Sequence, residues 1–380
     1  MSVPYRWTIV ASVNQEGEES MLRKALLTAS LVGMLVASGV ANAGTKLTLI
    51  QPNNGTMGFY GLHVARVLGY YEEEGVELKL LNGDTSVPYV AFLTNGNADL
   101  AMLDGPQTFQ AKNEGVGTKT VYTVMLGAPE GVFVAKDSPI QSVTELKGKT
   151  VGLASDRDAA SLAVAMAHAG SDAKGIKTVI VGDAGPTLAN VFLKGTAAAF
   201  AGSINDLAAL EARGIPIRDI TPKSAKNAPA NTYAMLEKRM DELKKPLCGF
   251  FRAYSKAVYV GTQDIEIVAS MSRHPDGVPH EWEDAAFGYK YLDAVDDLQI
   301  NADTGKSGKI GHVDEAAWKG VMKDMLMIGA IDKKYDVNSF ISNDFIGCAN
   351  DFDKAEVMAE ARAWMADPKN AKYTDKSKWK

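Results

Sequence analysis

The segment LTLIQPNNGTMGFYGLHVARVLGYYEEEGVELKLL, residues 47–81, contains one complete strand–helix–strand unit. Its apolar run Leu47–Ile50 predicts a buried strand, and Phe59–Tyr71 repeats apolar residues at helical spacing until Gly75 stops the helix. A second strand, Val76–Leu81, follows at once. Such a βαβ unit brings two strands into one parallel sheet and covers them with the helix between them.

The same alternation continues along the chain. Further strands are expected at 100–103, 121–126, near 132, and at 150–153, 178–181 and 197–200, with helices at 87–94, 106–114, 142–146, 158–168, 187–193 and 204–213. Beyond Met235 the pattern is mainly helical, at 236–244, 247–263, 283–297, 314–328 and 354–364. This order predicts an α/β fold of two βαβ lobes, each with a mostly parallel sheet, and a cleft at the carboxyl ends of the strands.

Composition and charge describe an ordinary globular protein without a basic surface. The chain has 380 residues, 46% of them hydrophobic and 23% charged, and a formal net charge of -6. That length suits two cores of roughly 150 residues each. Since nucleic acids and anionic membranes are bound by concentrated positive charge and no Lys/Arg-rich block is present, we expect neither as a partner.

The N-terminal region, residues 1–43, has the pattern of a leader for export. Two basic residues precede an apolar run, Ala25–Val40, that ends in an Ala-Asn-Ala motif, so cleavage is expected before Gly44. The run is shorter than the ~20 apolar residues that a membrane anchor needs. We expect translation to start at Met21, which makes residues 21–43 a signal peptide for export to the periplasm.

Two cysteines follow the leader, Cys248 and Cys348. An oxidising compartment permits a disulfide between them, and two buried, unpaired thiols are an equal alternative from the sequence alone. The histidines are scattered without ligand spacing, so we expect no metal site.

Four segments share a family pattern. They are the stretch FYGLHVARVLGYYEEEGVEL at 59–78, LTNGNADLA at 93–101, IQSVTELKGKTVG at 140–152 and FLKGTAAAF at 192–200. Together they resemble the bacterial ABC-transporter substrate-binding family that serves sulfonates, taurine, nitrate and thiamine-pyrimidine precursors. Ala198 departs from the pattern, because the family usually has Asp there.

The resemblance implies the type II periplasmic-binding-protein fold. Residues 44–131 and 232–380 would form lobe 1 and residues 132–231 lobe 2, with hinge crossings near Glu130–Val132 and Asn231–Tyr233. The protein would close around a small-molecule ligand and pass it to an ABC permease in the inner membrane. We expect it to act as a monomer, without a cofactor.

Candidate ligand contacts are polar residues that follow the predicted strands, where helix N-termini offer unpaired N–H groups. They are Asn53, Asn54, Tyr60, Asp84, Asp104, Gln107, Glu130, Arg157, Asp158, Ser161, Ser203 and Asn205. Each could instead cap a helix or hold a turn, and Asp84, Asp158 and Asp206 suit that role better.

The charges near the predicted cleft bear on the ligand. Arg157 has the planar fork that binds a sulfonate or carboxylate, yet Asp156 and Asp158 flank it. Together with Asp104 and Glu130 these carboxylates would repel an anion. The pattern therefore favours a neutral or cationic ligand, hydroxylated or nitrogen-containing.

Two other functions fit the same fold. The eukaryotic pyrimidine-precursor synthase shares the resemblance and uses a pyridoxal-phosphate lysine, a reactive histidine and a cysteine-rich motif. Here His63 follows Phe59-Tyr60, but there is no cysteine cluster, so we expect no enzyme. A receptor that presents its ligand to a sensor protein is the other alternative, and the sequence leaves it open.

Overall fold

The computed structural model describes residues 44–52, 55–83, 88–182, 186–296, 298 and 307–376. The predicted leader, including Met21, therefore lies outside the described residues, as do Asn53, Asn54 and Asp84. No described helix is both long enough and apolar enough to cross a membrane.

The first sheet has five strands in the order β2-β1-β3-β10-β4. They are β1 Thr45–Pro52, β2 Val76–Gly83, β3 Leu100–Leu103, β4 Thr118–Met125 and β10 Ala230–Leu236. β1 is parallel to β2 and β3, whereas β10 is antiparallel to both of its neighbours. All of β3 is buried, which is typical of a strand covered on both faces.

The second sheet has five strands in the order β7-β6-β8-β5-β9. They are β5 Glu130–Ala135, β6 Thr150–Leu153, β7 Lys177–Ile180, β8 Ala199–Ser203 and β9 Ile217–Asp219. The chain passes from the first sheet to the second between β4 and β5 and returns between β9 and β10. The predicted lobe boundaries near residues 131 and 231 fall in the first residues of β5 and β10, directly after these two crossings, and the division into lobes stays a prediction.

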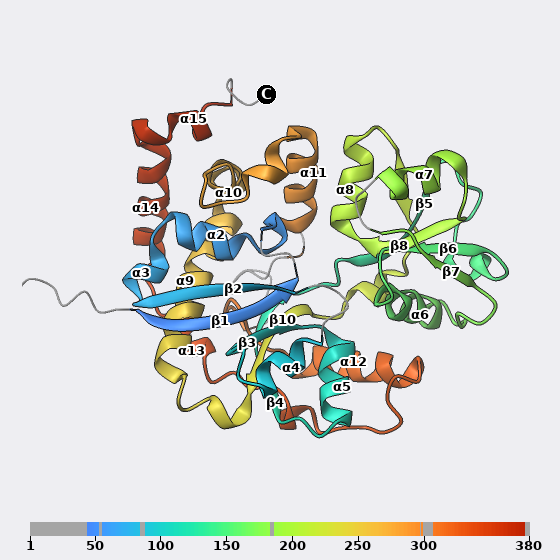
Figure 1. Cartoon of the computed structure of the whole chain (residues 1–380), viewed down its shortest axis with the longest axis horizontal. Helices are drawn as coiled ribbons and strands as arrows, with labels where there is room; N and C mark the ends of the chain where they lie inside the picture. Colours follow the sequence, from blue (N-terminus) through green and yellow to red (C-terminus); the bar gives the residue numbers. More distant parts are fainter. Residues whose placement is uncertain are drawn as a thin grey trace, which may run out of the picture. The chain divides into compact units, whose positions relative to one another are not determined.

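Helices cover both sheets (Figure 1). The α-helices before β10 are α2 Tyr60–Val67, α3 Tyr70–Glu73, α4 Tyr89–Thr94, α5 Gly105–Asn113, α6 Asp158–His168, α7 Pro186–Lys194 and α8 Ile204–Ala212. Those after it are α9 Lys244–Gln263, α10 Ile265–Ser272, α11 Ala285–Asp296, α12 Glu315–Met327, α13 Ile346–Ala349, α14 Lys354–Ala366 and α15 Ala371–Thr374. Short 3₁₀ helices are η1 Met57–Phe59, η2 Val143–Leu146, η3 Lys223–Lys226, η4 Glu237–Arg239, η5 Pro279–Trp282, η6 Val337–Ser339 and η7 Pro368–Asn370.

The first sheet separates two apolar cores. Figure 1 shows α2 and α10 on one side of β1 and β2, with α4 and α5 on the other. On the first side α2 and α9 enclose a core in which the Tyr122 and Phe251 rings stack with centroids 4.8 Å apart. A disulfide between Cys248 of α9 and Cys348 of α13 closes this side. The structure thereby decides between the two states that the sequence left open for the cysteines.

The predicted α/β architecture is confirmed, and several elements have the predicted bounds. β3, β6 and α6 occupy the expected residues. The single helix predicted for 59–71 was wrong, because Gly69 has a left-handed φ of 79° that separates α2 from α3. The sequence pattern also missed β9 and β10, whose partners in the sheets are remote in sequence.

Candidate functional site

A cavity of about 400 Å³ lies where the two sheets face each other. Its walls include residues that follow the carboxyl ends of β1, β3, β6 and β8, together with both chain crossings between the sheets. This is the position at which α/β sheets usually bind ligands, because helix N-termini and loops converge there. Helices α11 and α12 complete the wall with Tyr291, Val321, Asp324 and Met325.

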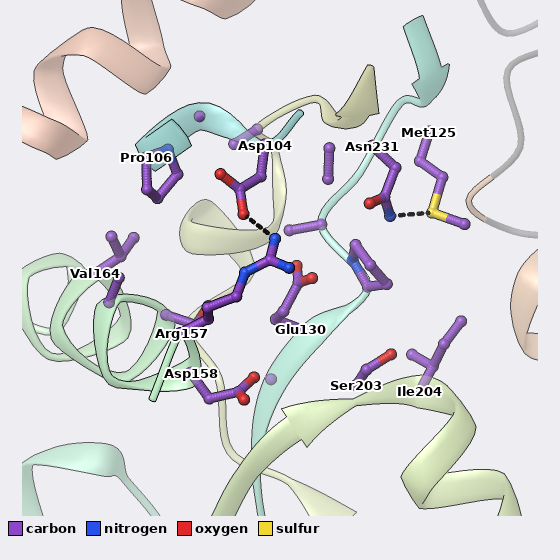
Figure 2. A pocket seen from close by; sticks show the side chains of 18 of the residues that line it. Asp104, Pro106, Met125, Glu130, Arg157, Asp158, Val164, Ser203, Ile204 and Asn231 are labelled. Carbon is purple, nitrogen blue, oxygen red and sulfur yellow. Dashed lines mark hydrogen bonds and ion pairs between the residues drawn. The ribbon is translucent and has the colours of Figure 1, made fainter. Parts of the chain in front are cut away.

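An ion pair crosses the cavity between the first turns of α5 and α6 (Figure 2). The Arg157 Nη2 atom donates to Asp104 Oδ2 at 2.6 Å, and both side chains are mostly buried. The other Asp104 oxygen, Oδ1, accepts from the backbone N–H of Gln107 at 2.8 Å and caps α5. The start of α5 therefore fixes the Asp104 side chain, and the same side chain binds the Arg157 guanidinium at the start of α6.

Glu130, the first residue of β5, extends its carboxyl into the same part of the cavity (Figure 2). Burial raises the pKa of this carboxyl to about 7. The nearby carboxylates of Asp104 and Asp158 add to the rise, whereas the Glu130 backbone N–H and the Arg157 guanidinium oppose it. Glu130 can therefore exchange a proton near neutral pH.

Two further carboxylates of the wall hold turns. Asp158 Oδ2 accepts from both the backbone N–H and the hydroxyl of Ser155, each at 2.8 Å. Asp206 Oδ2 accepts from the backbone N–H of Ser203 at 2.9 Å, as part of a capping box at the start of α8. These are the structural roles that the sequence favoured for both aspartates, and both also line the cavity.

The structure brings most of the predicted site residues together and places two elsewhere. The cavity wall contains Asp104, Glu130, Arg157, Asp158, Ser161, Ser203 and Asn205. Gln107 is not among the lining residues, and it forms a capping box with Asp104 at the start of α5. Tyr60 is fully buried in the core, where its hydroxyl donates to the backbone oxygen of Val258 at 3.3 Å. The expected ligand contact from Tyr60 is therefore corrected: as the first residue of α2 it packs against α9.

Sequence reasoning missed the contributions of α11 and α12. The Tyr291 hydroxyl lies 2.9 Å from the hydroxyl of Thr56, and both residues line the cavity. Asp324 of α12 lies 2.9 Å from Nε2 of His168, at the end of α6. The search for polar residues directly after predicted strands could not find these residues, because α11 and α12 come after the last described strand, β10.

His63 does not line the cavity. It is buried within α2, and its Nε2 lies 3.1 Å from the Ser272 hydroxyl. Burial lowers the pKa of His63 to about 3, with Arg66 and His280 acting in the same direction. Among the described residues, no group of three His, Cys, Asp or Glu side chains is arranged to hold a metal ion.

Comparison with known proteins assigns the family. The model of the family described as "NMT1/THI5 like" matches residues 56–264. The chain belongs to the NMT1/THI5-like family. This NMT1/THI5-like protein has the fold of type II periplasmic binding proteins: the periplasmic aliphatic sulphonate binding protein SsuA from Escherichia coli superimposes with a TM-score of 0.60 at 17% identity, over 78% of this chain and 92% of that one.

Two relatives of this NMT1/THI5-like protein have names that describe different functions. The riboflavin-binding protein RibY of Chloroflexus aurantiacus is 24% identical over 297 residues, 76% of this chain and 82% of RibY. The 4-amino-5-hydroxymethyl-2-methylpyrimidine phosphate synthase of Legionella pneumophila is 28% identical over 119 residues, 31% of this chain and 38% of the synthase. The first match covers most of both proteins, and the second covers less than half of either.

Proposed function

We propose that this protein is an exported periplasmic solute-binding protein, which binds a small organic molecule in the cavity between its two sheets and delivers it to an ABC importer. The observation that carries the proposal is the cavity itself, with polar side chains contributed from both sheets and the Asp104–Arg157 ion pair across it. The family, the fold and the long match to a riboflavin-binding protein support it.

Residues 44–131 and 232–380 form one lobe in this proposal, and residues 132–231 form the other. Opening and closing take place at the two crossings, and ligand contacts from both lobes favour the closed state. Asn231, the second residue of β10 and directly after the second crossing, has a φ of 52°, and no other non-glycine residue of the described chain has a positive φ. Contacts between the lobes include the Asp104–Arg157 pair and Lys290–Glu211, whose charged atoms are 3.4 Å apart.

The ligand is neutral or cationic, and hydroxylated or nitrogen-containing. Arg157 is the one Lys or Arg among the described residues of the wall, and Asp104 already binds it. An anion would have to displace Asp104 and then lie beside the remaining carboxylates. The protein is expected to act as a monomer, with the ligand and the ABC permease as its partners.

The enzyme alternative has weaker support than the binding function. In the enzyme alternative His63 would have to react with substrate, but this histidine is buried away from the cavity and bonded to Ser272. The match to the pyrimidine phosphate synthase also covers only 31% of this chain. A receptor for a sensor protein would use the same cavity, so the two binding functions differ only in the protein that receives the closed form.

Native mass spectrometry of the exported, purified protein tests the binding function. We expect a non-covalent small molecule to co-purify, and small-angle scattering to show an increase in the radius of gyration when that molecule is dialysed away. A covalent adduct on a lysine would indicate an enzyme instead. Stimulation of ATP hydrolysis by the reconstituted permease would support delivery to an importer, and stimulation of a histidine kinase alone would support the sensor alternative.

A further inference from the structure

The carboxylates of the cavity wall are not equivalent. Four of them have partners within the protein: Asp104 binds Gln107 and Arg157, Asp158 binds Ser155, Asp206 binds Ser203, and Asp324 binds His168. Each of these acids is used to hold a turn or to join two helices. They shape the electrostatic potential of the cavity, and part of the acceptor capacity of each is already used within the protein.

Glu130 differs from these four acids. Its carboxyl accepts a hydrogen bond from its own backbone N–H, and no ion pair or side-chain hydrogen bond to it occurs within the described residues. Arg157, the one Lys or Arg in the described cavity wall, is bound at 2.6 Å to Asp104. Glu130 is thus a cavity carboxyl with unused acceptor positions and no counter-charge of its own.

A ligand that approaches Glu130 meets a negative environment. Asp104 of α5 and Asp158 of α6 both act on the Glu130 carboxyl as like charges, and Arg157 is the cation that opposes them. A partly desolvated carboxylate in such surroundings is stabilised most by a group that brings a positive charge and N–H donors together. A neutral hydroxyl supplies a donor without the charge, and an anion supplies neither.

We propose that Glu130 determines ligand selectivity by binding a protonated nitrogen, an amine or an amidine-type group, on a small organic ligand. This inference rests on the proposed binding function, because it assigns a ligand class to that same cavity. The Asp104–Arg157 pair then serves to neutralise the arginine, so that the cavity retains a net negative potential for the incoming cation.

Two sets of matched probes test the charge preference without any variant. Benzamidine, benzamide and benzoate share one ring, and cyclohexylmethylamine, cyclohexylmethanol and cyclohexanecarboxylate share another. We expect millimolar benzamidine or cyclohexylmethylamine to raise the melting temperature at pH 8.5, with no rise for the alcohol, amide or carboxylates. The proposal would be overturned if neither cation raised the melting temperature, whether or not the anions or the neutral probes raised it.

The variant Glu130→Gln keeps the shape of the side chain and removes its charge. We expect it to weaken binding of the stabilising cation by at least ~10-fold, as loss of a charge-assisted hydrogen bond does. Glu114→Gln is the matched control, because Glu114 is exposed at the end of α5 and outside the cavity. An affinity within twofold of wild type for Glu130→Gln would remove Glu130 from the site.

The pH dependence separates a direct contact from a change in packing. Since the pKa of Glu130 is about 7, its ionised fraction falls by a factor of roughly 30 between pH 8.5 and pH 5.5. Wild-type affinity for the cation should fall by a similar factor, and the affinity of Glu130→Gln should stay constant.

Failure of the proposed role of Glu130 would differ in its results from failure of the proposed binding function. A co-purified anion or neutral molecule in native mass spectrometry would contradict the role of Glu130 and leave a solute-binding protein. No bound small molecule of any class, with no stabilisation by any of the six probes, would count against both.

Discussion

Arg157 Nη2 lies 2.6 Å from Asp104 Oδ2, although the two residues precede helices that follow strands of different sheets. Asp104 follows β3 in the first sheet, and Arg157 follows β6 in the second. The pair therefore links the two sheets across the ligand cavity. Because each side chain is mostly buried, removal of one partner leaves the other charge poorly solvated.

A double-mutant cycle measures this link. We expect Asp104→Asn and Arg157→Gln to show a coupling energy of about 1 kcal/mol in the free energy of unfolding, determined with urea. The matched control is the pair Lys147–Asp172, whose side chains are 48% and 57% exposed and whose coupling should be smaller. Equal coupling in both cycles would mean that the Asp104–Arg157 pair adds nothing beyond a surface contact.

The disulfide between Cys248 and Cys348 should contribute strongly to stability. It joins residues separated by 100 positions, and closure of such a long loop restricts the unfolded chain. We expect Cys248→Ser with Cys348→Ser to lower the free energy of unfolding by about 4 kcal/mol, measured by thermal or urea denaturation. Dithiothreitol should lower the melting temperature of the wild type and leave that of the double variant unchanged. If dithiothreitol also lowered the melting temperature of the double variant, its effect on the wild type would not be due to this disulfide.

Glu281 should make stability depend on pH. Its Oε2 accepts from the backbone N–H of Met57 at 2.6 Å, and burial raises its pKa from 4.5 to about 7. Because the raised pKa favours the protonated form of the folded state, this contribution is fully present below pH 4.5 and is lost as the pH rises through 7. We expect Glu281→Gln to become more stable relative to wild type, by roughly 3 kcal/mol at most, between pH 4.5 and pH 8. A constant difference across that range would contradict the shift.

Asn231 allows a test of the second crossing. Its φ of 52° lies in the left-handed region, which costs a residue such as alanine about 1 kcal/mol more than glycine. Asn231→Ala and Asn231→Gly both lose the contact from Nδ2 to the Met125 sulfur at 3.3 Å, so their difference isolates the backbone. We expect the alanine variant to be the less stable of the two in urea. Equal stability would show that the crossing relaxes to an ordinary backbone conformation.

Local patterns predicted the elements that depend on few remote contacts. The apolar run at 100–103 and the alanine-rich segment at 158–168 have the predicted bounds, because burial and helical propensity act within each segment. The polar residues after β3, β6 and β8 were also found, since the carboxyl ends of parallel strands converge at one edge of a sheet. The sequence alone thus determined the alternation of strands and helices and placed seven polar residues in what the structure shows as the cavity wall.

Only the tertiary structure decided which of those residues have unused bonding capacity. Arg157 is bound to Asp104, Tyr60 is directed into the core, and β10 enters the first sheet between β3 and β4 from more than a hundred residues away. The choice of partner for a buried charge or strand edge depends on competition among all groups brought near it by folding. The residues adjacent to Glu130 in the sequence do not indicate which groups fold near it. The capacity of its carboxyl to bind a ligand therefore follows only from the assembled tertiary structure.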